Sequence, residues 1–143
     1  MTENDCAPET GGEMANYTLK PLEEIPDVLG DYPGEMRMGS FGLDCEQVAF
    51  TWRRMPQQTG GKGSYGHRHK TQEEIYFVAS GSLLFKLEDE VMEVPAGTVI
   101  RVGPDVARSV WNEGPDDAVL IMVSKKLDDP GADIEKVEDF WPA

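Results

Sequence analysis

Short runs in which apolar and polar residues alternate with a period near two fill most of the chain between Val48 and Ser124. The strand-like runs cover residues 48–53, 74–79, 83–87, 91–94, 98–102, 108–111 and 118–124. Turns that contain Gly or Pro, and the acidic turn Glu88-Asp89-Glu90, separate them, and no helical periodicity interrupts them. Many short strands at regular spacing predict an all-β fold, either a sandwich or a closed barrel.

The two ends of the chain differ from this middle. Residues 1–16 are polar and acidic with few apolar side chains, and we expect a disordered leader there. Residues 17–128 are predicted to form one β-barrel domain. In the remaining segment, 129–143, apolar residues recur at helical spacing, so the sequence predicts either a short C-terminal helix or an extended arm on the barrel.

Charge and hydropathy limit the partners and the location. The net charge is -14, and residues 1–35 hold nine acids against one base, whereas residues 36–115 are nearly balanced. Such a chain should avoid nucleic acid and anionic membranes, although acidic ends could instead bind a basic partner. The longest apolar run, Ala118–Val123, is too short to cross a bilayer, and Met1–Glu13 does not resemble a secretory signal. We therefore expect a cytoplasmic protein.

Both histidines of the chain occur in the sequence Gly66-His67-Arg68-His69. On a strand, residues i and i+2 point to the same face, so the two imidazoles should share one space. A hairpin-like return could bring Glu74 beside them. Two imidazoles and one carboxylate suit Fe(II), Mn, Ni or Zn. The alternative is a pair of surface histidines on a flexible, glycine-rich loop.

The same segment resembles the first conserved motif of the cupin superfamily, with every defining position present from Gly61 through His67, His69 and Glu74 to Gly81. The segment 97–112 is similar to the second motif, but its middle departs from the pattern. Arg108 occupies the position of the family's remaining metal-binding histidine. The resemblance covers roughly residues 40–125 and implies a double-stranded β-helix (jelly-roll) barrel, a single-domain small cupin and a homodimer.

Arg108 weakens the expectation of a metal. A guanidinium about 6 Å from a divalent ion would repel it by about 5 kcal/mol at an effective dielectric near 20. Arg108 could pair with Glu74 instead, so that Arg108, Tyr76 and Glu74 bind a small organic acid or a sugar derivative without a firmly held metal. If Arg108 turns to solvent, His67, His69 and Glu74 could still hold a catalytic metal in an oxygenase, isomerase or decarboxylase.

Two further expectations follow. A structural cupin whose pocket has lost its function is a third alternative, because a fold does not by itself imply an activity. The remaining strand arginines, Arg53, Arg54 and Arg101, are expected to face solvent or to pair with acids.

Overall fold

The computed structural model describes residues 16–143, and nearly all of the regular secondary structure in this range is β-strand. The strands are β1 (Glu35–Met38), β2 (Val48–Met55), β3 (Thr59–Gly60), β4 (Ser64–His69), β5 (Glu74–Ser80), β6 (Ser82–Leu87), β7 (Glu90–Pro95), β8 (Val99–Val102), β9 (Arg108–Asn112), β10 (Ala118–Lys125) and β11 (Ile134–Trp141). The helical segments are a 3₁₀ turn at Leu22–Glu24, α1 (Gly39–Gly42) and α2 (Pro130–Asp133). The all-β prediction is confirmed.

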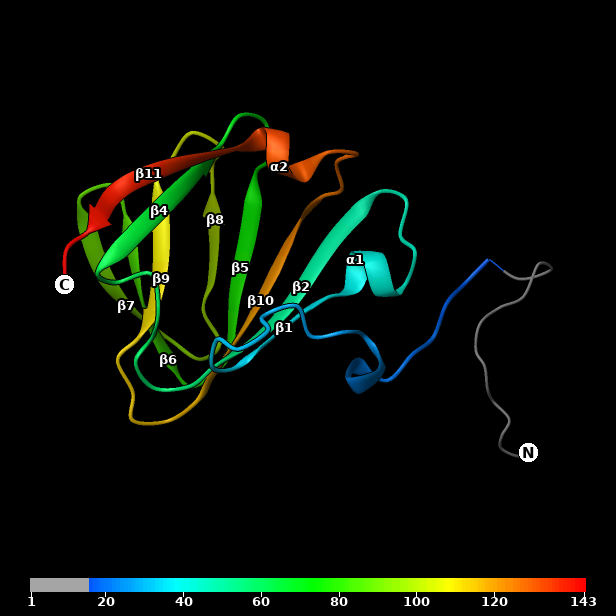
Figure 1. Cartoon of the computed structure of the whole chain (residues 1–143), viewed down its shortest axis with the longest axis horizontal. Coiled ribbons are helices and arrows are strands. Elements are labelled where there is room, and N and C mark those ends of the chain that lie inside the picture. The colour runs from blue at the N-terminus through cyan, green and yellow to red at the C-terminus, as the bar shows by residue number, and fades with distance from the viewer. Residues whose placement is uncertain (1–15) are drawn as a thin grey trace.

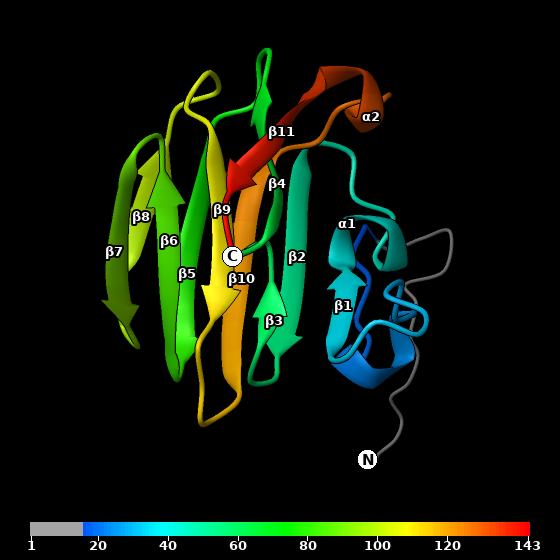
Figure 2. The ribbon, with the colours of Figure 1, turned by 60° about the vertical axis from the view of Figure 1, so that its left-hand side comes forward.

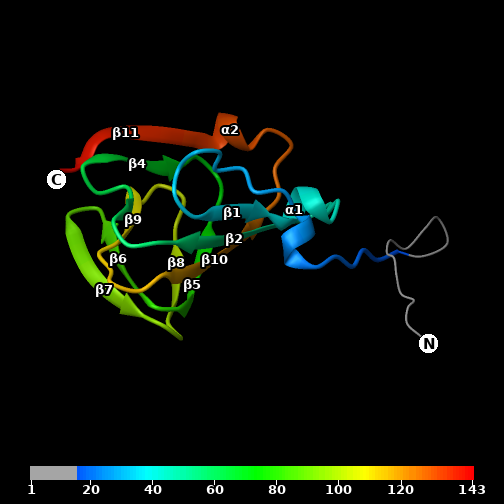
Figure 3. The ribbon, with the colours of Figure 1, turned by 60° about the horizontal axis from the view of Figure 1, so that its bottom comes forward.

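Two antiparallel sheets face each other and enclose the interior of the barrel (Figures 1 and 3). One sheet has the strand order β1-β2-β10-β5-β8. The other has the order β11-β4-β9-β6-β7, with β3 paired to β9. Strands that lie far apart in sequence are therefore neighbours, which is how β4, β5 and β9 come to supply one site.

The core between the sheets is apolar toward the β6–β7 side. Its buried members are Met55, Tyr76, Val78, Leu83, Phe85, Val94, Val102, Ala118 and Leu120. The rings of Tyr76 and Phe85 pack edge to face across the two sheets, with centroids 5.4 Å apart. Because inward side chains alternate along each strand, the core fixes the register that also points His67, His69 and Glu74 inward.

The C-terminal segment covers one end of the barrel. After the single helical turn of α2, β11 pairs antiparallel with β4, with Ile134 opposite His69 and Lys136 opposite His67 (Figure 2). Of the two predicted forms of residues 129–143, the structure therefore has a helical turn followed by a paired strand. The predicted acidic leader, residues 1–16, lies outside the described residues except for Asn16.

The direction of Arg53 differs from the sequence prediction. Arg53 lies opposite Met36 on β1 and Leu120 on β10, so its side chain shares the inner face of the sheet with the buried Leu120. The aromatic residues of β2 point outward instead, where Phe50 packs so closely on Gly39 of α1 that a Cβ at that glycine would lie 2.7 Å from the ring. The prediction was wrong for Arg53, because alternation along a strand does not say which face lies inside the barrel, whereas Arg54 and Arg101 pair with acids as predicted.

Among residues 16–143, no helix is long and apolar enough to cross a membrane.

Candidate functional site

A cavity of about 410 Å³ opens between the two sheets. Its lining comes from β1, β2, β3, β4, β9 and β10 and from the loop before β1: Leu29, Tyr32, Met36, Arg53, Gly60, Gly61, Ser64, Tyr65, Gly66, His67, Arg108, Ser109, Val110, Leu120 and Met122. The volume falls within the range of small-molecule sites in proteins. His67 and Arg108 lie directly opposite each other in the β4–β9 register, so both border this space.

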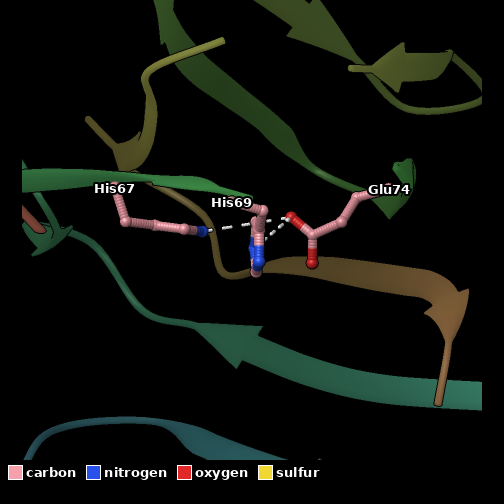
Figure 4. Close-up of side chains that lie close together, drawn as sticks. All are labelled: His67, His69 and Glu74. Carbon is pink, nitrogen blue, oxygen red and sulfur yellow. Dashed lines mark ion pairs between the residues drawn. The ribbon is translucent and has the colours of Figure 1, made fainter. Parts of the chain in front are cut away.

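The residues His67, His69 and Glu74 come together as the sequence predicts (Figure 4). One ligand atom from each lies within 4.8 Å of the others. The Nε2 atoms of His67 and His69 lie 3.9 and 3.5 Å from Glu74 Oε1, and the two rings meet edge to face. The strand period places both imidazoles on the inner face of β4, and Glu74 begins β5 across the interior.

Asp133, at the end of α2, contacts the ring nitrogen of His69 that points away from Glu74. Its Oδ2 lies 3.1 Å from His69 Nδ1 and also accepts the backbone N–H of Gln72, while Oδ1 accepts the backbone N–H and hydroxyl of Thr71. Burial raises the pKa of the Asp133 carboxyl, but these hydrogen bonds outweigh it and hold that pKa below its usual range. The ionised carboxylate favours the tautomer of His69 with a proton on Nδ1 and a lone pair on Nε2.

That tautomer leaves an incomplete contact. His69 Nε2 is buried and has no hydrogen-bond partner among the described residues, although it faces the acceptor Glu74 Oε1. A lone pair facing a carboxylate oxygen is stabilised only by a cation or a donated proton between them. The donor set of His67, His69 and Glu74 thus fits a divalent metal, with Asp133 as the group that orients one ligand.

Arg108 competes for the same carboxylate oxygen. It is the largest fully buried side chain described, with no exposed surface, and its Nη2 donates to Glu74 Oε1 at 3.1 Å. Its Nη1 donates to three carbonyl groups of the turn before β9: Gly103 at 3.3 Å, Pro104 at 3.1 Å and Val106 at 2.6 Å. A metal on Glu74 Oε1 would therefore lie beside a guanidinium that four hydrogen bonds hold in place.

Tyr76 joins the two charged groups. Its hydroxyl donates to Glu74 Oε1 at 2.6 Å and accepts from Arg108 Nε at 3.3 Å. Burial, followed by the charge of Glu74, raises the pKa of the Tyr76 hydroxyl, so it stays protonated. Burial also raises the pKa of the Glu74 carboxyl, but the nearby imidazoles of His67 and His69, the Tyr76 hydroxyl and the Arg108 charge outweigh it. That pKa lies well below its usual range, and Glu74 is ionised.

The sequence missed two residues of this region, Asp133 and Arg53. Asp133 is 64 positions from His69 and lies in a segment whose form the sequence left open, so no local signal joins the two. The sequence did contain a clue to Arg53. It lies on the opposite face of the strand from Phe50 and Trp52, so its charged side chain should face either solvent or a cavity. The assignments of Arg108, Tyr76 and Glu74 to a ligand, and of His67, His69 and Glu74 to a metal, stay predictions.

Comparisons with known proteins agree with this fold. Residues 54–124 match the family model described as a cupin domain, Cupin_2. An uncharacterized protein of Methanocaldococcus jannaschii is 38% identical over 48 residues, which cover 34% of this chain and 38% of that protein. The chain thus matches well under half the length of that curated relative.

Two solved structures show the same architecture. A cupin protein from Bacteroides fragilis is 21% identical with a TM-score of 0.62, and the match covers 80% of this chain and 88% of that one. An uncharacterized conserved protein with a double-stranded β-helix domain from Klebsiella pneumoniae is 15% identical with a TM-score of 0.63, covering 85% and 97% of the two chains. At these identities the likeness concerns the fold and leaves the chemistry open.

Proposed function

Since this chain is a small cupin barrel with a Cupin_2 domain, we propose that it binds a small organic acid or a sugar derivative in the cavity beside His67 and Arg108, without a firmly held metal. The proposal also rests on two resemblances in the sequence: residues 61–81 resemble the first cupin motif, and Arg108 stands at a ligand position of the segment that resembles the second motif. A positive cavity in a chain of net charge -14 would concentrate an anion that the rest of the surface repels.

The single observation that carries the proposal is the contact between Arg108 and Glu74. Their 3.1 Å ion pair lies inside the barrel and neutralises the one carboxylate that a metal would need. Because Arg108 is fully buried and also donates to three backbone carbonyls, displacing it would break several hydrogen bonds at once. The two imidazoles then remain as hydrogen-bonding groups for a ligand.

A second candidate, a metal-dependent enzyme, is favoured by a different observation. His69 Nε2 is buried, oriented by Asp133 and without a partner among the described residues, as expected of a metal ligand. His67, His69 and Glu74 would hold the ion, and Fe, Mn, Ni or Zn would supply an open Lewis-acidic position for an oxygenation, isomerisation or decarboxylation.

Metal content separates the two candidates. We would measure it by elemental mass spectrometry on protein purified without an affinity tag or added chelator, beside the variant Arg108→His. The proposal predicts little metal in the wild type and tighter Ni²⁺ or Mn²⁺ binding by the variant, because the substitution removes a charge and adds a ligand. A near-stoichiometric metal in the wild type that disappears in His67→Ala would instead favour the second candidate. Metal binding that the variant leaves unchanged would contradict the role given to Arg108.

We also propose that the protein is a homodimer. The outer face of the sheet that contains β5 and β8 is rich in apolar side chains, and Ile75 and Val99 on it are 44% and 60% exposed. Covering such a face with a second copy would remove apolar surface from water. Light scattering after gel filtration, with Val99→Asp as the disrupting variant, tests it. A cytoplasmic location stays a prediction.

A further inference from the structure

Arg53 is a second arginine of the interior, and among residues 16–143 it has no ion-pair partner, unlike Arg108. Its Nε atom is buried without a hydrogen bond, and no carboxylate among residues 16–143 lies within ion-pair distance of its guanidinium. The next residue, Arg54, pairs with Asp117 at 3.0 Å and Glu35 at 3.6 Å on the outer side. An arginine stays protonated in proteins, so Arg53 brings an uncompensated positive charge into the barrel.

The surroundings of Arg53 hold no carboxylate. The described residues that line the 410 Å³ cavity include no Asp or Glu, and the side-chain hydroxyls of its wall belong to Tyr32, Ser64, Tyr65 and Ser109. Taking a cation out of water is costly unless an anion compensates it. Burial accordingly lowers the pKa of the Arg53 guanidinium. No acidic group of residues 16–143 balances this charge, whereas an anion that enters the cavity would.

The other residues that line the cavity indicate which kind of molecule would carry the anionic group. Met36, Val110, Leu120 and Met122 belong to the same wall as Arg53 and His67, and these four side chains give a bound molecule an apolar surface without hydrogen bonds. Arg53 shares a row with Leu120 and Val78, and Glu74 lies four residues from Val78 on β5, or about 13 Å along the strand. A bound molecule thus contacts apolar side chains between a cationic end at Arg53 and the imidazole end at His67.

We infer that Arg53 anchors the carboxylate of an organic acid with an apolar body, whose other end lies at His67. This inference rests on the proposed function and narrows it from organic acids and sugar derivatives to apolar monocarboxylic acids. The planar guanidinium offers Nε–H and an Nη–H in the fork that a carboxylate accepts. A phosphate dianion is less well matched, because a single guanidinium without an ion-pair partner would leave half of its charge uncompensated.

The test uses hydrocinnamate as the apolar acid, its amide hydrocinnamide as the uncharged analogue and gluconate as the sugar acid. Binding of each to the full chain would be measured by calorimetry and by the shift in unfolding temperature. The variants are Arg53→Met, which removes the charge, Arg53→Lys, which keeps the charge but loses the fork, and Arg54→Met as a matched control. Circular dichroism would check that each variant is folded.

We expect hydrocinnamate to bind the wild type and Arg54→Met, and to bind Arg53→Met about 10- to 100-fold more weakly, as expected when a charge-assisted hydrogen bond is lost. Hydrocinnamide and gluconate should bind the wild type less well than hydrocinnamate does. The affinity of Arg53→Lys for hydrocinnamate should lie between those of the wild type and Arg53→Met. If an acid binds equally to Arg53→Met and wild type, or hydrocinnamide matches hydrocinnamate, the role of Arg53 is refuted while acid binding stands. If no acid binds the wild type at millimolar concentration, both proposals fail.

Discussion

The interior of this barrel contains two arginines in opposite conditions. Arg108 is completely buried and every nitrogen of its guanidinium has a partner: Glu74, Tyr76 and a turn of backbone. Arg53, on the inner face of the other sheet, has no anionic partner among the described residues and borders open space. The first has the surroundings of a structural group, and the second has those of a binding group. Burial alone does not separate these roles, whereas counting the partners of each donor does.

At each of the two arginines, an aspartate holds a terminal segment of the chain in place through hydrogen bonds. Asp133 fastens the C-terminal segment over the β4–β5 connection beside Arg108. Asp27 fastens the N-terminal loop that carries the cavity residues Leu29 and Tyr32, because its Oδ1 accepts the N–H groups of Leu29 and Met36. Asp133 is buried and uses both oxygens, whereas Asp27 is exposed and uses one. The Arg108 end should therefore be the more rigid of the two.

The largest expected effect is the loss of stability on removing Arg108. Arg108→Met leaves Glu74 as a buried charge without its cation and three carbonyls without donors, so the free energy of unfolding should fall by about 3–5 kcal/mol. Arg53→Met removes a charge that has no partner and should change it by less than about 1 kcal/mol in either direction. Urea unfolding at neutral pH measures both values.

Two controls sharpen this prediction. Arg101→Met removes an exposed arginine paired with the exposed Glu73, and should change stability by less than about 1 kcal/mol. The double variant Arg108→Met with Glu74→Gln should recover part of the loss, because the buried charge is gone. Equal losses for Arg53→Met and Arg108→Met would show that the contrast between the two arginines is wrong.

The difference between the partners of Arg108 and Arg53 could not be predicted from the sequence. The fold could be predicted, because period-two runs and turns suffice to indicate a β-barrel. The grouping of His67, His69 and Glu74 followed from strand alternation together with the resemblance to the motif. The partners of an arginine depend on strands that pair across the sheets, as β9 with β4 and β2 with β10, and on turn carbonyls with no side-chain signature. The inward direction of Arg53 depends on α1 covering the aromatic face of β2, a tertiary effect that alternation does not encode.

The second effect concerns Asp133. Asp133→Ala removes the acceptor of four hydrogen bonds and leaves the N–H groups of Thr71 and Gln72 without partners, so the free energy of unfolding should fall by about 2–3 kcal/mol. His69 should also lose its preferred tautomer, visible in the nitrogen chemical shifts of its ring. Asp128→Ala, an exposed acid of the same segment, is the control and should change neither value. An unaltered His69 spectrum in Asp133→Ala would show that Asp133 does not orient that ring.

The smallest effect is local and concerns Asp27 at the Arg53 end. The N–H groups of Met36 and Leu29 hold the pKa of the Asp27 carboxylate below its usual range, so its stabilising contacts are present above about pH 4 and are lost as the pH falls through the lowered pKa. Asp27→Ala should speed hydrogen exchange at the amides of Leu29 and Met36 at neutral pH without changing exchange in the core. After correction for the intrinsic rate, the wild type should approach the variant in acid, and Asp31→Ala, on the same loop, should behave as wild type. Protection that persists in Asp27→Ala would mean that the loop is held by its apolar contacts with the cavity.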